Sequence, residues 1–194
     1  ETKNREDNYK KILTELEKQQ QAIGDEIDSI EDVLRAQFGS TELPKKRPGV
    51  FLTPIDGARM SQAYGATKFA QKAYKSKFHN GVDYGVPIGT PVMAADGGVV
   101  LMAGNNGRVQ YGRYIVIKHA NGLTTLYALL SKQSVKTGET VERGQIIGYS
   151  GNTGYSTGPH LHFTVYLSSS VKLQAIGGAG VIPVGYTINP EDYL

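Results

Sequence analysis

Apolar residues recur every three or four positions along the first 38 residues, with polar and charged residues between them. Steps that alternate between four and three residues define a heptad seam, which is typical of a helix that packs along one side. The seam residues are Tyr9, Leu13, Leu16, Gln20, Ile23, Ile27, Ile30 and Leu34. Only Gln20 is polar, and Gly39 provides a stop signal just after Phe38. The sequence therefore predicts a coiled-coil helix over residues 1–38, whose partner is another copy, an upstream helix or the domain that follows.

The pattern changes after a linker predicted over residues 39–49, in which two prolines and a basic triplet disfavour regular structure. Short apolar or alternating runs then follow, separated by turn signals such as Asp96-Gly97 and Asn121-Gly122. The predicted strands are Val50–Leu52, Pro91–Ala95, Gly97–Ala103, Tyr114–His119, Leu123–Leu130, Gln145–Ser150 and His160–Leu167. Residues 68–77 alone look helical. We therefore expect a mainly β domain over 50–194, built as an antiparallel β-sheet groove and preceded by the coiled-coil helix.

Charge is divided unevenly along the chain. Residues 1–38 carry ten acidic and six basic residues, whereas residues 39–194 carry eight acidic and fifteen basic ones. The β domain therefore has a formal net charge of +7, which favours an anionic partner such as nucleic acid or bacterial cell wall, or simply serves solubility.

Composition limits the possible chemistry. The 24 glycines and 12 tyrosines suit a β-rich domain with many tight turns. Because there is no cysteine, disulfides and thiolate metal sites are excluded, while the redox compartment stays open. No apolar run approaches the ~18 residues of a membrane span. The sequence begins at Glu1 without Met or a signal-like segment, which suggests a processed or shortened chain.

Three of the four histidines fall within two short motifs. His160 and His162 stand two apart in an alternating run, so both side chains are expected on one face of a strand. Far upstream, His79 and Asp83 offer a second imidazole and a carboxylate four residues apart. His79, Asp83 and one of the two later histidines would form a His₂Asp zinc site with one position open. The alternative is that the histidine pair lies on the surface or only contributes to packing.

The same motifs carry a resemblance to a known family. The segments are FHNGVDYGVPIGTPVMAADGGVV, YIVIKHANGLTTLYALLS and VKTGETVERGQIIGYSGNTGYSTGPHLHF. In their order and spacing these segments resemble the lysostaphin/LytM-type zinc metallopeptidases (peptidase family M23), and the likeness covers about residues 50–194. It implies an antiparallel β groove with Zn²⁺ on its floor and peptides of bacterial peptidoglycan as substrate. A coiled-coil segment is also common ahead of such domains.

By this resemblance His79, Asp83 and His162 fall on the family's three zinc ligands. His160 falls on a catalytic histidine, which would relay a proton to or from the attacking water. His119 matches a strand end before a turn, and we interpret it as a structural residue.

One position departs from the family pattern. Where the family has Tyr-x-His-Leu, this chain has Tyr127-Ala128-Leu129-Leu130, so Leu129 replaces a second catalytic histidine. Leucine neither donates a hydrogen bond to an oxyanion nor moves a proton, and losing one such group costs about 10²–10³ in rate. We expect strand alternation to put Tyr127 and Leu129 on one face, directed at the metal. Tyr127 and His119 are then the first residues to consider as replacements.

These observations predict an extracytoplasmic zinc endopeptidase of the cell envelope, periplasm or secreted fraction, weakened at Leu129. The alternative is a non-hydrolytic cell-wall-binding module or an activator of another murein hydrolase. Degenerate family members of that kind usually lose metal ligands, whereas all three are kept here. A nucleic-acid-binding module rests on the +7 charge alone, because the exposed aromatic pattern of single-strand binders is missing. We therefore expect no nucleic-acid partner and no membrane span.

Overall fold

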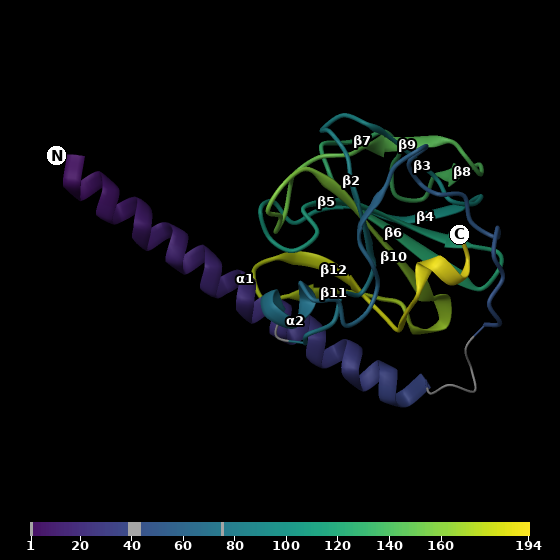
Figure 1. The fold of residues 1–194 in the computed structure, drawn as a ribbon, viewed down its shortest axis with the longest axis horizontal. Helices are drawn as coiled ribbons and strands as arrows, with labels where there is room; N and C mark the ends of the chain where they lie inside the picture. The colour runs from purple at the N-terminus through teal and green to yellow at the C-terminus, as the bar shows by residue number, and fades with distance from the viewer. Residues whose placement is uncertain (1, 39–43, 75) are drawn as a thin grey trace.

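The first segment is one long helix, α1 (Thr2–Phe38), whose N-terminal part extends away from the β domain while the rest lies along it (Figure 1). The computed structural model describes residues 2–38, 44–74 and 76–194, so residues 39–43 of the predicted linker lie outside the described residues. The remaining linker residues lie against the β domain, where Lys46 pairs with Asp192 at 2.9 Å and the Tyr193 hydroxyl donates to the Pro44 carbonyl at 2.9 Å.

The domain is built around one antiparallel sheet in the order β1-β2-β10-β6-β5-β4-β8, with β13 paired to β10. A smaller sheet in the order β3-β9-β7 and a hairpin formed by β11 and β12 complete the described strands. These findings confirm the predicted mainly antiparallel β fold with an N-terminal helix. The strands of the main sheet are β1 (Met60–Gln62), β2 (Val82–Gly85), β4 (Gly98–Asn105), β5 (Arg113–His119), β6 (Leu123–Leu130), β8 (Thr140–Val141), β10 (His160–Leu167) and β13 (Thr187–Ile188). The others are β3 (Pro91–Met93), β7 (Lys132–Gln133), β9 (Ile146–Tyr149), β11 (Lys172–Ile176) and β12 (Gly180–Val184).

Two sequence predictions need correction. Residues 50–52 do not form a strand; instead the Phe51 and Leu52 N–H groups donate to the carbonyls of Tyr193 and Ala95, which are single contacts outside any ladder. The helix expected over 68–77 shortens to α2 (Ala70–Ala73), and residue 75 of that prediction lies outside the described residues. Short 3₁₀ turns follow β10 (Ser168–Ser170) and close the chain (Pro190–Asp192).

The main sheet is apolar on both faces, and each face has its own cover. One face packs against the β3-β9-β7 sheet in a core that includes Ile115, Tyr127 and Phe163. The opposite face, with residues such as Leu126, packs against the β11–β12 hairpin and the second half of α1. The sheet is therefore buried on both sides, which explains why every residue of β6 is buried.

The domain itself covers the second half of the helix seam, as one of the three predicted alternatives proposed. Ile23, Ile27 and Leu34 are 5%, 1% and 4% exposed, and the first two join the cluster on the sheet. The first half of the seam remains exposed, with Leu13 and Leu16 both at 40%. The heptad pattern thus contains two different surfaces, one docked on the domain and one still open.

Candidate metal centre

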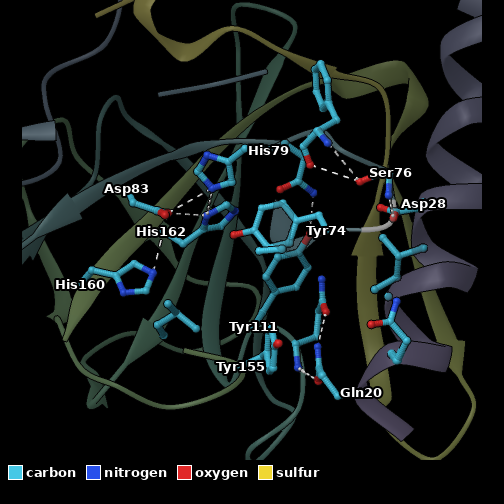
Figure 2. A pocket seen from close by; sticks show the side chains of 18 of the residues that line it. Gln20, Asp28, Tyr74, Ser76, His79, Asp83, Tyr111, Tyr155, His160 and His162 are labelled. Atoms are coloured by element: carbon cyan, nitrogen blue, oxygen red, sulfur yellow. Dashed lines mark hydrogen bonds and ion pairs between the residues drawn. The ribbon is translucent and has the colours of Figure 1, made fainter. Parts of the chain in front are cut away.

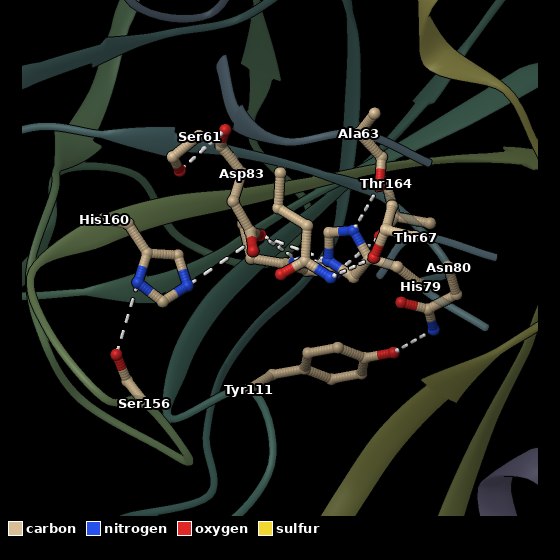
Figure 3. A network of polar contacts seen from close by, with 12 residues as sticks. Ser61, Ala63, Thr67, His79, Asn80, Asp83, Tyr111, Ser156, His160 and Thr164 are labelled. Carbon is tan, nitrogen blue, oxygen red and sulfur yellow. Dashed lines mark hydrogen bonds and ion pairs between the residues drawn. The ribbon is translucent and has the colours of Figure 1, made fainter. Parts of the chain in front are cut away.

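Strand pairing brings the predicted metal ligands together. Strands β2 and β10 are antiparallel neighbours in which Asp83 stands directly opposite His162. The Asp83 Oδ1 atom lies 2.8 Å from His162 Nδ1 and 3.3 Å from His79 Nε2, and the two ring nitrogens are 3.2 Å apart (Figure 3). All three side chains are buried, and their potential ligand atoms lie within 4.8 Å of one another.

Gly81 makes this approach possible, because it lies between His79 and Asp83 with no room for a side chain. A Cβ atom at this position would lie 2.5 Å from the Phe163 carbonyl oxygen and 2.8 Å from His162 Cε1. The Gly in the His-Asn-Gly-Val-Asp motif is therefore required by the close contact of the two segments.

The outer nitrogens of the two rings already have partners. His79 Nδ1 lies 2.9 Å from the Ala63 carbonyl oxygen, which only accepts, so Nδ1 carries the proton and Nε2 offers its lone pair. His162 Nε2 lies 2.9 Å from the Thr164 hydroxyl, which leaves Nδ1 directed at Asp83. Two imidazole lone pairs and a carboxylate converging in a buried space form a donor set that suits Zn²⁺, with its outer hydrogen bonds in place.

The charge states also favour a cation. Burial alone would raise the pKa of Asp83, but the contacts of its carboxylate with the His162 and His79 rings outweigh burial and hold that pKa well below its ordinary value. Burial lowers the pKa of His162, despite the opposing effect of Asp83. Near neutral pH the centre therefore contains an ionised carboxylate and a neutral His162, the forms that bind metal.

His160 lies at the edge of this cluster rather than within it. Its Nδ1 is 2.7 Å from the Gly158 carbonyl oxygen, to which it donates, and Ser156 Oγ lies at 3.3 Å. The other nitrogen, Nε2, is 3.8 Å from Asp83 Oδ1, and the side chain is 19% exposed. A partly exposed imidazole whose Nδ1 is held by a carbonyl and whose Nε2 lies near Asp83 can accept or donate a proton at Nε2.

Leu129 lines the cavity because of a backbone conformation that the sequence did not indicate. The expectation that Tyr127 and Leu129 share a face is wrong, because Tyr127 packs in the core on the far side of the sheet. Leu129 has a φ of 67°, and this left-handed conformation turns its side chain onto the face that carries the candidate ligands. Strand alternation fails here because the pairing of β5 with β6 shifts register between Arg113 and Ile115.

The structure places neither suggested replacement in the cavity. The Tyr127 hydroxyl accepts a hydrogen bond from the Ala95 N–H at 2.8 Å. His119 contacts the Gly97 carbonyl oxygen at 2.9 Å and the Thr125 hydroxyl at 2.8 Å, so both of its ring nitrogens have protein partners. Burial lowers the pKa of His119, which fits a neutral structural residue as predicted.

Three aromatic residues that the sequence reasoning missed complete the site. Tyr111 stacks on His162, with ring centroids 5.9 Å apart, and Tyr74 stacks on His79 at 6.0 Å. Tyr155 projects from the loop before β10 and is 56% exposed. These residues line a cavity of about 340 Å³ together with His160, Leu129 and the candidate ligands (Figure 2). No spacing pattern marks them, since each comes from a different loop.

Beside this cavity, helix α1 buries a carboxyl group against Asn80, which is one of the residues that line the cavity. Glu31 is 3% exposed, and both of its oxygens lie within 3.4 Å of Asn80 Nδ2. The same Asn80 amide donates to the Tyr111 hydroxyl at 3.1 Å. Burial raises the pKa of Glu31 to about 8; Asp28 adds to this rise, whereas Asn80 and Arg35 oppose it.

This burial predicts a pH-dependent stability. Because the pKa of Glu31 is raised in the folded state, the native protein binds more protons than the unfolded chain between the ordinary pKa of 4.5 and about 8. The free energy of unfolding should therefore fall as pH rises through that window. Urea unfolding of the parent and of Glu31→Gln at several pH values measures this effect, and the variant should lose the Glu31 part of the slope. Parallel pH profiles for the two proteins would contradict the prediction.

Fold and site together define an antiparallel β-groove protein with a candidate His₂Asp metal centre. Peptidase family M23 matches residues 77–174, about half of the chain, and the chain belongs to this family. It is 45% identical over 111 residues to the peptidoglycan DD-endopeptidase ShyA of Vibrio cholerae, which is 57% of this chain and 25% of that protein. It is 40% identical over 119 residues to the DD-carboxypeptidase/endopeptidase Mpg of Neisseria meningitidis, 61% of this chain and 27% of that protein. The chain thus spans about a quarter of the length of these relatives.

Solved structures show the same architecture. The catalytic domain of lysostaphin from Staphylococcus simulans aligns with a TM-score of 0.53 and 33% identity, covering 66% of this chain and 89% of that domain. A zinc-containing peptidase from Vibrio cholerae aligns with a TM-score of 0.56 and 30% identity, covering 75% and 41% of the two chains. The predicted family resemblance and fold are confirmed.

Proposed function

We propose that this protein is a zinc-dependent endopeptidase that cleaves peptide stems or cross-bridges of bacterial peptidoglycan, with activity reduced by Leu129. The observation that carries the proposal is the convergence of His79, Asp83 and His162 in a buried cavity with His160 at its edge. One of the relatives is named as a peptidoglycan DD-endopeptidase and another as a DD-carboxypeptidase/endopeptidase, and one similar structure is named as zinc-containing.

The residues have distinct proposed roles. His79, Asp83 and His162 hold Zn²⁺, which when bound supplies a Lewis acid that activates water and polarises the scissile carbonyl. His160 accepts the proton of the attacking water at Nε2 and returns it to the leaving amine, while the Gly158 carbonyl fixes its ring. Leu129 offers no donor to the developing oxyanion, which is why turnover is expected to be slow.

Digestion of purified cell walls tests the proposal. The zinc-loaded protein should release peptides slowly from the walls, a chelator should stop the release, and added Zn²⁺ should restore it. His160→Ala is expected to release none while keeping its metal. Equal peptide release by the parent and by His160→Ala would refute the assigned role of His160.

The same site supports one second candidate, a wall-binding module or an activator of another murein hydrolase. Leu129 favours it, because a site without a donor for the oxyanion can bind a wall peptide and still turn it over slowly. This function would be identified if the parent bound to cell walls in a pull-down and if neither the parent nor Leu129→His released any peptide.

The proposed target places the protein outside the cytoplasm, in the cell envelope, the periplasm or the secreted fraction, because peptidoglycan lies there. Among the described residues, no helix is both long enough and apolar enough to cross a membrane. The proposed division of the chain is the coiled-coil helix over 1–38, the linker over 39–49 and the peptidase domain over 50–194.

We also propose that the exposed first half of the α1 seam pairs with another helix or a second copy. Leu13 and Leu16 remain 40% exposed on the helix face whose continuation is docked on the domain. Leu13→Glu/Leu16→Glu should weaken self-association measured by light scattering, because charges would enter an apolar seam. Thr14→Glu/Ala22→Glu, on the opposite side of the helix, is the matched control and should associate like the parent. A monomeric parent would exclude pairing with a second copy.

A further inference from the structure

One face of α1 lies over the cavity that contains the candidate metal ligands. Gln20, Gly24 and Asp28 are spaced four residues apart, so they follow one another along the same side of the helix, and all three line the cavity (Figure 2). Gly24 has no neighbour within 4 Å of a hypothetical Cβ atom, so the middle of this face leaves open space. The helix therefore contacts the cavity walls through two polar side chains with a gap between them.

Gln20 binds one wall of the cavity through its side-chain amide. Its Oε1 accepts a hydrogen bond from the Gln110 backbone N–H at 2.8 Å, and its Nε2 donates to Gln110 Oε1 at 2.9 Å. The side chain is only 8% exposed, although it interrupts an otherwise apolar seam. Because the Gln20 Oε1 atom is an amide carbonyl oxygen like that of a peptide bond, the Gln110 N–H can donate to the carbonyl of a peptide amide in the same way.

Asp28 binds the other wall with a carboxylate. Its Oδ2 accepts a hydrogen bond from the Ser76 backbone N–H at 3.2 Å. Ser76 belongs to the segment between α2 and β2, just before candidate ligand His79, and it lines the same cavity. Without α1, the Ser76 and Gln110 N–H groups would face the cavity and would lose the acceptors that the helix provides.

The spacing of the two contacts sets the length of a peptide that would replace them. Gln20 and Asp28 are eight positions apart in the helix, which corresponds to about 12 Å along the helix axis. An extended chain advances ~3.3–3.6 Å per residue, so three to four residues span the same distance.

We infer that the backbone N–H groups of Ser76 and Gln110 are two anchoring points for the substrate peptide, and that α1 occupies them in its place. The ligand is a short extended peptide that places an amide at Gln110 and a carboxylate at Ser76, three to four residues apart. This inference rests on the proposed function only for the peptide nature of the ligand. Helix and peptide compete for the same donors, so the apparent affinity for peptide depends on how often the helix leaves them.

The helix can give up these two contacts without losing its attachment. Ile23, Ile27 and Leu34 remain buried, the first two against the sheet and hairpin, and Glu31 keeps its contact with Asn80. A variant that lacks only the two anchors, Gln20→Ala/Asp28→Ala, should therefore still fold with α1 near the domain. Gln19→Ala/Glu26→Ala removes an amide and a carboxylate from exposed positions of the same helix and serves as the matched control.

Binding of a defined peptide to the zinc-loaded full chain tests the inference. The test peptide is an N-acetylated tetra-alanine with D-alanine at its last two positions, whose only carboxylate is the C-terminus. Titration calorimetry should show about tenfold tighter binding to Gln20→Ala/Asp28→Ala than to the parent, because two competing hydrogen bonds are lost. The control variant should bind like the parent. The C-terminal amide of the same peptide should bind the variant several-fold more weakly than the free acid, because a charged acceptor makes the stronger hydrogen bond.

Backbone NMR locates the contact. In the ¹⁵N-labelled variant, the amide resonances of Ser76 and Gln110 should shift when the peptide is added. Unchanged resonances at both positions with shifts elsewhere in the cavity would overturn the inference, as would equal affinity of parent and variant or no binding at millimolar peptide. Because binding is measured and not cleavage, a protein that binds as predicted but never hydrolyses walls would refute only the proposed function.

Discussion

Replacing Leu129 with histidine is expected to raise the hydrolysis of wall peptides by about 10²–10³-fold without changing the zinc content. The side chain at position 129 lines the cavity with His160 and the candidate ligands. An imidazole there would donate to the oxyanion that develops on the scissile carbonyl. The backbone is already suitable, because Leu129 has a φ of 67° and histidine accepts the left-handed conformation more readily than leucine does. Turnover of a soluble wall peptide, measured with metal analysis on the same samples, provides the readout.

Two further variants distinguish oxyanion binding by the new imidazole from easier entry of the substrate under a loosened helix. Leu129 belongs to the same apolar cluster as Ile23 and Ile27, so any smaller side chain would also loosen the helix over the cavity. Leu129→Ala removes this packing without adding an imidazole and should gain little activity. Adding His160→Ala to Leu129→His should abolish the regained activity while zinc stays bound. If Leu129→Ala gained as much as Leu129→His, helix release and not oxyanion binding would explain the effect.

Asp83→Ala is expected to weaken zinc binding at least about 100-fold, since a ligand matters no less than the outer-sphere groups whose loss costs 10–100-fold. Asp83 Oδ1 lies within 3.3 Å of one nitrogen from each of the two candidate histidine ligands. Its removal leaves two buried imidazoles without the negative charge that offsets a dication. Metal analysis after dialysis, together with a competition titration against a chelator, measures the loss.

A histidine outside the cavity gives the matched control. His119→Gln should change the zinc content little, because His119 contacts Gly97 and Thr125 on the other side of the sheet. Circular dichroism of both variants checks that the fold is retained. If Asp83→Ala and the parent had the same zinc content, Asp83 would not be a ligand. The four-residue spacing between His79 and Asp83 would then have no role in metal binding.

The sequence by itself determined most of the sheet and the contents of the candidate site. Strands β5, β6 and β10 could be predicted because each alternating or continuous apolar run has a glycine-containing turn at one end, such as Asn121-Gly122 between β5 and β6. The three candidate ligands could be named because two short motifs bring the donor atoms together once β2 pairs with β10. These features depend on residues that are close in sequence or on a single strand pairing.

Only the tertiary structure decided which surfaces meet across that sheet. The heptad pattern showed that α1 needs a partner, but the domain was only one of three possibilities until Ile23 and Ile27 were seen in its cluster. The position of Leu129 depends on one left-handed residue beside a register shift, which breaks the period of two that sequence reasoning assumes. Gln20 looked like a defect in an apolar seam, yet its amide binds Gln110, 90 residues away in the chain. Hydrophobic period reports which side of an element is buried, whereas the partner is selected by the packing and hydrogen bonding of segments distant in sequence.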